Sequence, residues 1–344
     1  MWRIFTQLLN VSEKSKCLIN QTVKQYRARL FKISIEETSA ATRGFIIRDI
    51  YKKQKLEDIG LTFLYGYHLA IADAELEILA TQLNVVKTEM RGFAFEGAAM
   101  GLALLDYFTP WQRNRLKNFL SGIAINHIYM GYVGTGWLLA RVPGGIQRYL
   151  RSLNQPHQEF PDPLLGWLAV DGYGFHAGYF HHQHYLQPQN MPSEIDGYAL
   201  RVFDQGLGRS LWFIYGADIP QIAATINTFN QVRQADLWSG VGLACGYAGG
   251  VNRQEIETLR ELAGLYLPHL AQGVAFAAKA RERAGNPTSD TEMACQVLLG
   301  ISAQTAAEIT DKLLIDLPYD AALPAYEIWR QLIQKQFATL GVPV

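Results

Sequence analysis

Acidic side chains recur just before a series of glycine motifs, and they are the residues of this 344-residue chain best suited to acid–base chemistry. The carboxylates are Glu96, Asp171, Asp204 and Asp236, and the amides Gln205 and Gln272 occupy similar positions. A helix dipole holds a carboxylate at a helix N-terminus ionised, whereas burial raises its pKa and prepares it to donate a proton. Aspartate also caps helices, so each acid has a purely structural alternative.

Large aromatic side chains follow the same glycines and predict an apolar pocket. They are Trp137, Tyr173, Phe175, Trp212, Phe213 and Trp238. A pocket with aromatic walls and a few carboxylates suits an extended hydrophobic substrate, and ring faces stabilise a positive charge that develops on it. Arg209 belongs to the same set of candidate catalytic residues. The alternative is that the aromatic residues are core.

The segment from Asp171 to Tyr185 contains four histidines, of which His176 is a candidate general base. His176 and His181 are five residues apart, too far round a helix to act as an i, i+4 pair of ligands. Neither an HExxH motif nor a two-His-one-carboxylate spacing occurs. We therefore expect a helix end rich in partly exposed histidines and no metal site, and the sequence identifies no cofactor.

Signatures of several enzyme classes are missing from the sequence. Gly206 to Ser210 has the wrong spacing both for a phosphate-binding loop with Lys-Ser/Thr and for a GxGxxG motif. A GxSxG elbow and the DDxxD and DxDD motifs of terpene cyclases are also absent. The function must therefore be argued from the predicted pocket.

A glycine period positions these residues. The repeated glycines are 37, 38, 34, 34 and 33 residues apart, at Gly97, Gly134, Gly172, Gly206, Gly240 and Gly273. Most are followed two residues later by a second small residue, which lets helix backbones approach closely at the same level. A period of this length is typical of a helical hairpin that buries its apolar face only by stacking on its neighbours.

Apolar glycine helices alternate with more polar helices in the second half of the chain. We expect Asp218, Asp236, Asn252 and Ser302 to stand at helix starts. The fold class is therefore all-α, with repeated hairpins of about 35 residues. Helices that are apolar nearly all round must be buried on both faces, which favours a closed α/α toroid over an open, TPR-like solenoid.

The chain divides into an N-terminal amphipathic helical extension, residues 1–55, and a single hairpin-repeat domain, residues 56–344. Basic residues between Lys14 and Lys32 alternate with apolar ones such as Leu18 and Leu30. Such a helix packs on its own domain or makes peripheral contact with a membrane. The uncharged stretch 119–140 is long enough to span a bilayer, but its glycines, Asn126 and His127 favour a buried helix pair.

Composition excludes some partners and compartments. Lys plus Arg and Asp plus Glu both total 31, so no basic surface for nucleic acid is expected. The three cysteines are far apart, with no CxxC pair, which indicates a reducing compartment. No secretory signal is visible at the N-terminus. We expect a cytoplasmic protein.

Several segments resemble a bacterial family of proteins of unknown function named for its occurrence in enediyne biosynthesis clusters. The resemblance covers roughly residues 85–335, and the segments that carry it are 91–97, 171–181, 205–213, 236–244 and 281–288. It implies a context in secondary metabolism, beside an iterative polyketide synthase whose linear polyene becomes an enediyne core. It implies cluster-encoded partner proteins, and it supplies no catalytic residues.

Three functions follow as hypotheses. The first is an enzyme that isomerises or cyclises a long polyene by acid–base chemistry. The second is a terpene-cyclase-like enzyme that acts on an isoprenoid polyene. The third is a non-catalytic helical-repeat adaptor for a polyketide synthase or a membrane partner. A closed cavity of several hundred Å3 would support the first two, and an open groove lined by polar outer helices would support the third.

Overall fold

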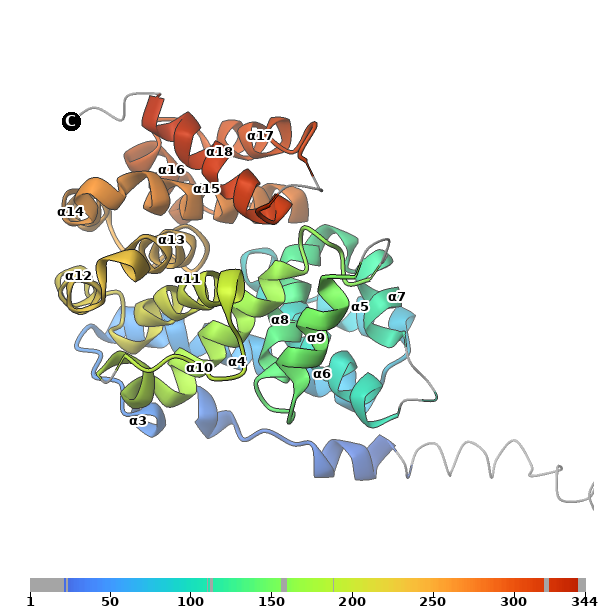
Figure 1. Cartoon of the computed structure of the whole chain (residues 1–344). Helices are drawn as coiled ribbons and strands as arrows, with labels where there is room; N and C mark the ends of the chain where they lie inside the picture. Colours follow the sequence, from blue (N-terminus) through green and yellow to red (C-terminus); the bar gives the residue numbers. More distant parts are fainter. Residues whose placement is uncertain are drawn as a thin grey trace, which may run out of the picture.

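The computed structural model describes residues 22, 24–109, 111, 114–155, 160–187, 189–318 and 322–339, and these form helices and connecting segments with no strand. The all-helical prediction is therefore confirmed (Figure 1). The α-helices are α3 (Ala40–Arg43), α4 (Ile50–Ala72), α5 (Leu76–Asn84), α6 (Arg91–Phe108), α7 (Arg115–Ser121), α8 (Ile128–Leu139), α9 (Gly145–Leu153), α10 (Trp167–Leu186), α11 (Gly197–Ile214), α12 (Ile219–Thr228), α13 (Gln231–Tyr247), α14 (Arg253–Ala263), α15 (Leu267–Ala284), α16 (Ser289–Leu298), α17 (Ala303–Lys312) and α18 (Ala325–Thr339). Short 3-10 helices are η1 (Ile35–Thr38), η2 (Thr88–Met90), η4 (Ile125–His127) and η5 (Gly264–Tyr266).

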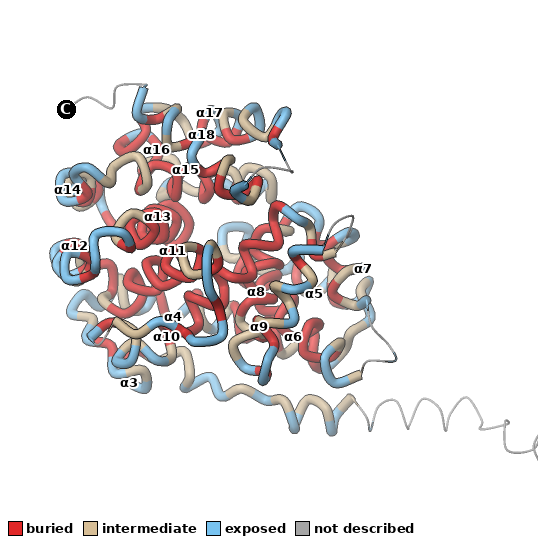
Figure 2. Tube along the Cα trace, in the orientation of Figure 1, coloured by how far each residue is buried: buried red, intermediate tan, exposed pale blue. Residues whose placement is uncertain are grey.

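Seven helices, which we call the glycine helices, pack one against the next in chain order. They are α4, α6, α8, α10, α11, α13 and α15. The shorter helices α5, α7, α9, α12 and α14 lie between them in sequence and pack on them, and α16 follows α15 and packs on it. Figure 2 shows α11 and α13 as mostly buried, whereas exposed, intermediate and buried residues mix along α12 and α14. The predicted alternation of apolar and polar helices is present in this part of the chain.

Paired glycines explain why the glycine helices pack so closely. A Cβ atom at Gly172 in α10 would overlap the backbone of Val133 in α8, and one at Gly174 would overlap Phe203 in α11. Residues two apart point in nearly opposite directions on a helix, because each residue turns by about 100°. The first glycine therefore faces the preceding helix and the second faces the following one. The same arrangement recurs at Gly134 and Gly136, at Gly206 and Gly208, and at Gly240 and Gly242.

Most of the predicted helix starts are confirmed. The side chains of Asp218, Asn252 and Ser302 cap α12, α14 and α17, as predicted. Asp236 does not start a helix, because α13 already begins at Gln231 and is capped by Asn230. The described residues between α10 and α11 contain no polar helix, so the alternation is interrupted there. Instead α10 kinks at His181 (φ −131°, ψ 34°) and continues to Leu186.

Within the described residues, the N-terminal region contains less helix than the sequence predicts. Residues 24–30 are helical, and Lys14 and Leu18 lie outside the described residues. The predicted boundary at residue 55 falls inside α4, which packs on α6 as the first glycine helix. The stretch 119–140 covers the end of α7, all of η4 and all of α8. Within the described residues no helix combines the length and the apolar character that a membrane span requires.

Candidate active site

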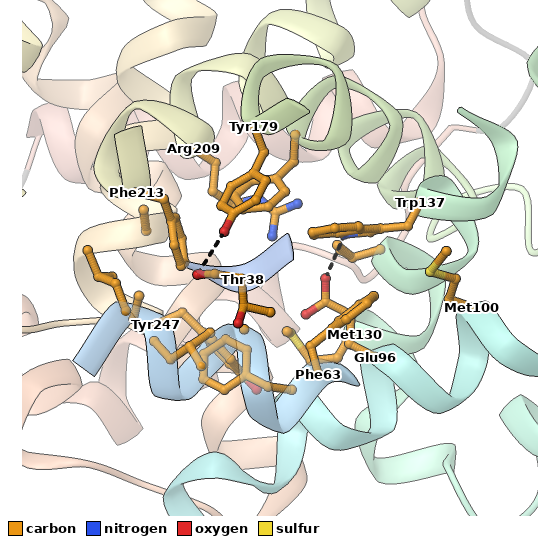
Figure 3. A pocket seen from close by; sticks show the side chains of 18 of the residues that line it. Thr38, Phe63, Glu96, Met100, Met130, Trp137, Tyr179, Arg209, Phe213 and Tyr247 are labelled. Atoms are coloured by element: carbon orange, nitrogen blue, oxygen red, sulfur yellow. Dashed lines mark hydrogen bonds between the residues drawn. The ribbon is translucent and has the colours of Figure 1, made fainter. Parts of the chain in front are cut away.

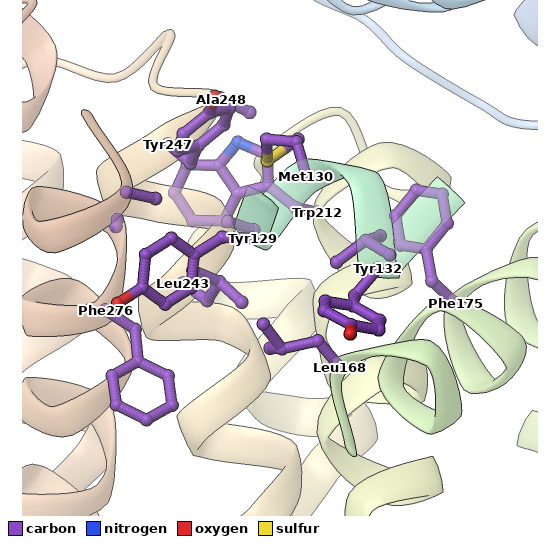
Figure 4. Close-up of a cluster of buried hydrophobic side chains, with 14 of the residues drawn as sticks. Tyr129, Met130, Tyr132, Leu168, Phe175, Trp212, Leu243, Tyr247, Ala248 and Phe276 are labelled. Atoms are coloured by element: carbon purple, nitrogen blue, oxygen red, sulfur yellow. The ribbon is translucent and has the colours of Figure 1, made fainter. Parts of the chain in front are cut away.

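One chamber is shared by all seven glycine helices, and a repeated sequence position lines it. The residue three after each repeated glycine faces this space in every case: Met100, Trp137, Phe175, Arg209, Leu243 and Phe276. Phe63 takes the same place on α4, three residues after Gly60. Figure 3 shows side chains from these separate helices converging on the chamber, and Figure 4 shows buried aromatic residues such as Tyr129 and Phe276 that continue its wall.

The chamber is narrow and partly covered. Its volume is about 90 Å3, whereas an engineered cavity of about 150 Å3 binds a single benzene molecule. Ile33, Glu37 and Thr38 from the segment around η1 line one side of it. That segment is held by a hydrogen bond from the Ala40 amide to Glu57 in α4 (2.9 Å). The cavity of several hundred Å3 expected for a long substrate is therefore not present in this conformation.

Glu96 supplies the chamber with a buried carboxyl group. It lies on the second turn of α6, so a helix N-terminus does not hold it ionised, and its side chain accepts a hydrogen bond from Trp137 Nε1 (3.1 Å). Burial raises its pKa to about 7, although Arg209 and the Trp137 hydrogen bond oppose the shift and Asp171 adds to it. A carboxyl group with this pKa exchanges a proton readily near neutral pH.

Arg209 lies opposite Glu96 across the chamber in Figure 3. Its Nη2 forms an ion pair with Asp171 Oδ1 (2.6 Å), and its guanidinium covers the Phe175 ring at 4.5 Å. Asp171 is fully buried and also accepts a hydrogen bond from Gln205 (2.9 Å). Burial raises the pKa of Asp171, while the neighbouring Arg209 opposes this shift. The pair thus brings a compensated charge to the wall of an otherwise mainly apolar space.

His176 is buried beside the chamber, and its neighbours are not the side chains of a metal site. Arg141 Nε donates a hydrogen bond to its Nε2 (3.1 Å), and its ring lies 5.6 Å from that of Trp137. Burial, followed by the charge of Arg141, lowers its pKa well below the usual value, so the ring is neutral near pH 7. Across the residues that the structure describes, no three His, Cys, Asp or Glu side chains are grouped so as to hold a metal ion.

Two of the predicted acids lie in ion pairs away from the chamber lining. Asp204 binds Arg233 through both carboxylate oxygens (2.9 and 2.6 Å), and burial raises its pKa to about 6 against the effect of that arginine. Asp236 binds Arg201 (3.0 Å) and the fully buried Arg330 of α18 (2.7 Å). Their geometry gives both acids a structural role.

The positions just before the later glycines form a buried row of hydrogen bonds, which we call the polar ladder. Gln205 donates to Asp171 (2.9 Å), Ser239 Oγ lies 3.4 Å from Gln205 Oε1 and 2.7 Å from Gln272 Oε1, and Arg330 donates to Gln272 (3.2 Å). The ladder runs from the chamber wall at α10 through α11, α13 and α15 to α18. The residues just before these glycines therefore lie close together, but most of them form hydrogen bonds with one another and do not line the chamber.

Comparison with known proteins identifies a family. Residues 22–337 match the family described as protein of unknown function (DUF1702). The chain belongs to this family. No curated protein and no solved structure gives a significant match. No named homologue links this DUF1702 chain to enediyne biosynthesis.

The aromatic predictions divide in a similar way in this DUF1702 chain. Trp137, Phe175 and Phe213 line the chamber. Tyr173 packs near Phe203 (6.0 Å between rings), Trp212 donates to the Gly249 carbonyl (3.0 Å), and Trp238 is almost fully buried outside the chamber lining.

Several lining residues were not predicted, although the sequence contains their signal. Tyr179 and Tyr247 each lie seven residues after a repeated glycine, as the predicted Phe213 does, on the same helix face as the residues three after it. Extending the search for aromatic residues to the seventh position after every repeated glycine would have found Tyr179 and Tyr247.

Proposed function

We propose that this protein binds a long apolar polyene in the chamber and isomerises it by acid–base chemistry, with Glu96 as the proton-transferring group. The observation that carries the proposal is a buried carboxyl group, with a pKa raised to about 7, on the wall of an aromatic chamber to which every glycine helix contributes. Isolated carboxylates are rarely buried without a structural partner. Glu96 accepts one hydrogen bond from Trp137 and has no ion pair in the described residues.

The proposed step moves one proton and no other atom. As a carboxylate, Glu96 takes a proton from a CH2 group beside the double bonds, and the electron pair moves along the chain. The same carboxyl group then returns the proton to a more distant carbon, so that the double bonds shift. The anionic charge that develops lies near Arg209, whose positive charge stabilises it.

The arrangement of the glycine helices supports a closed α/α toroid as the finer description of the fold. Arg281 and Arg283 at the end of α15 donate hydrogen bonds to the backbone oxygens of Glu89 (2.5 Å) and Ile125 (3.1 Å), just before α6 and α8. Lys52 of α4 pairs with Glu255 of α14 (2.5 Å). The last helices thus return to the first, as a ring around one chamber requires. An enediyne-type polyketide chain is the polyene that the family resemblance favours.

The experiment is incubation of the purified protein with a linear C15 polyene, followed by mass and absorbance analysis. We expect a shifted polyene chromophore at unchanged mass, and its loss in Glu96→Gln. Asp204→Asn is the matched control, since Asp204 is also a buried acid with a raised pKa but lies outside the chamber lining. Full conversion by Glu96→Gln would remove Glu96 from the mechanism, and no conversion by the wild type would refute the function.

A terpene-cyclase-like reaction has less support from the charges. Cyclisation of isoprenoid chains passes through carbocations, and Arg209 places a guanidinium in the wall that such a cation would face. Like charges a few ångströms apart in a medium of low polarity repel strongly. Prenyl diphosphates added to the same assay test this alternative directly.

An adaptor role is a second candidate, favoured by a separate groove. Its volume is about 720 Å3, and it lies between the segment 44–52, the end of α10 and the outer helices α12 and α14. Its lining includes Arg48, Lys52, Asp218 and Glu255. If no polyene binds or reacts, while charge reversal at Arg48 abolishes product formation in a reconstituted biosynthetic system, this candidate replaces the first.

A further inference from the structure

Arg209 is the exception at a repeated position of the chamber wall. The residue three after each of the other five repeated glycines is apolar: Met100, Trp137, Phe175, Leu243 and Phe276. An apolar side chain would complete the wall at no electrostatic cost, whereas a buried guanidinium requires compensation. The chain therefore carries a hydrogen-bond donor at a position that packing alone would give to a hydrophobic residue.

Not every N–H donor of Arg209 has an acceptor within the described residues. The side chain is about nine-tenths buried, and its polar contact among the described residues is the ion pair of Nη2 with Asp171. Its buried Nε has no hydrogen-bond partner. A buried donor left without an acceptor has lost its hydrogen bonds to water and is destabilising. An acceptor atom on a bound molecule would remove that destabilisation.

The other charged side chains of the wall are already engaged. Arg141 binds His176 (3.1 Å), and Glu37 binds Arg43 (2.8 Å). Asp171 balances the charge of Arg209, so a neutral acceptor would satisfy the guanidinium without adding a charge. A free carboxylate would bring an uncompensated negative charge beside Asp171 and Glu96, which is unfavourable in a buried site.

We infer that the chamber binds an apolar chain whose inner end carries a neutral acyl carbonyl, an ester or a thioester, and that Arg209 donates a hydrogen bond to this oxygen. The inference rests on the proposed function and names its substrate class. It also gives the electron pair a destination: when Glu96 removes a proton from a carbon conjugated with the carbonyl, the pair moves onto the oxygen held by Arg209. Returning the proton to another carbon restores the carbonyl.

The test uses the fluorescence of a conjugated tetraene as its binding signal. The probes are the methyl ester and the N-acetylcysteamine thioester of cis-parinaric acid, the free acid, and the matched tetraene hydrocarbon. A hydrogen bond to a charged group contributes about 1.5–3 kcal/mol, so we expect at least one of the two esters to bind about tenfold or more tightly than the hydrocarbon and the acid. The preferred probe distinguishes an ester from a thioester source.

Paired variants keep the test independent of folding. Arg209→Met combined with Asp171→Asn removes both charges of the chamber pair, so neither is left unbalanced, and we expect the ester advantage to fall to about onefold. Arg233→Met combined with Asp204→Asn removes the equivalent buried pair outside the chamber lining and should leave the advantage unchanged.

Three results would overturn the inference and one would not. Equal binding of ester and hydrocarbon by the wild type, or tightest binding of the free acid, excludes a neutral carbonyl as the ligand of Arg209. An ester advantage that persists without Arg209 excludes that residue. If the ester binds as expected but Glu96→Gln has no effect on conversion, the proposed chemistry fails while the binding assignment stands.

Discussion

Replacing Glu96 by glutamine should change how the stability of the protein depends on pH. The folded protein holds the Glu96 proton up to about pH 7, whereas the ordinary pKa of glutamate, 4.5, applies in the unfolded chain. At about 1.4 kcal/mol per pKa unit, this difference corresponds to about 3 kcal/mol. Between these two pH values the folded state binds more protons than the unfolded state, so the Glu96 contribution to stability falls as pH rises.

The assay is urea denaturation of the wild type and of Glu96→Gln at half-unit steps from pH 4.5 to pH 8. We expect the free energy of unfolding of the wild type, relative to the variant, to decrease by about 3 kcal/mol from pH 4.5 to pH 7 and then to level. Glutamine keeps an oxygen that accepts from Trp137, and the other titrating groups are common to both proteins. A difference that stays constant across this range would refute the buried, raised-pKa assignment of Glu96.

Three further predictions concern the frame of the chamber. Gly206→Ala places a Cβ against the Asp171 carbonyl in α10, so the helices must separate, and we expect a loss of about 1–3 kcal/mol in thermal unfolding; an unchanged Tm would contradict the close packing. Arg330→Met leaves Asp236 without one of its two arginines, which should cost about 3–5 kcal/mol in urea denaturation; a neutral result would show that the pair is dispensable. Because the chamber is too narrow for a long chain, binding of the ester probe should accelerate amide hydrogen exchange at residues 33–40, and unchanged exchange there would place the opening elsewhere.

The sequence predicted the helical stack because its main determinant is local and periodic. Gly172 and Gly174 lie two residues apart, so they face opposite sides of α10. Their spacing alone therefore indicates that α10 packs closely on two neighbouring helices. The caps at Asp218 and Asn252 are equally local, since the capping oxygen bonds to amides within three residues. Such signals are complete within a short segment.

The sequence could not distinguish a chamber acid from a paired acid, because the partner is distant in the chain. Asp204 and Glu96 have similar surroundings in sequence, but Arg233 reaches Asp204 from the next glycine helix. Asp236 meets Arg330, 94 residues further on, in a helix outside the glycine period. The sequence therefore predicted an all-helical chain with packed glycine helices, whereas the partners of its acids depend on contacts between distant segments.

The polar ladder has a consequence for how the molecule can deform. Its rungs join α10, α11, α13, α15 and α18 through buried side chains, so sliding one of these helices would strip partners from the others. We expect these five helices to move together as one rigid unit. No rung of the ladder reaches α4, whose first turns are pinned by Lys52 to Glu255 and by Lys55 to Asp290. The rest of α4 packs closely on α6, where a Cβ at Gly97 would overlap the backbone of Phe63, so we expect the chamber to open by movement of the segment 33–40 over a fixed α4.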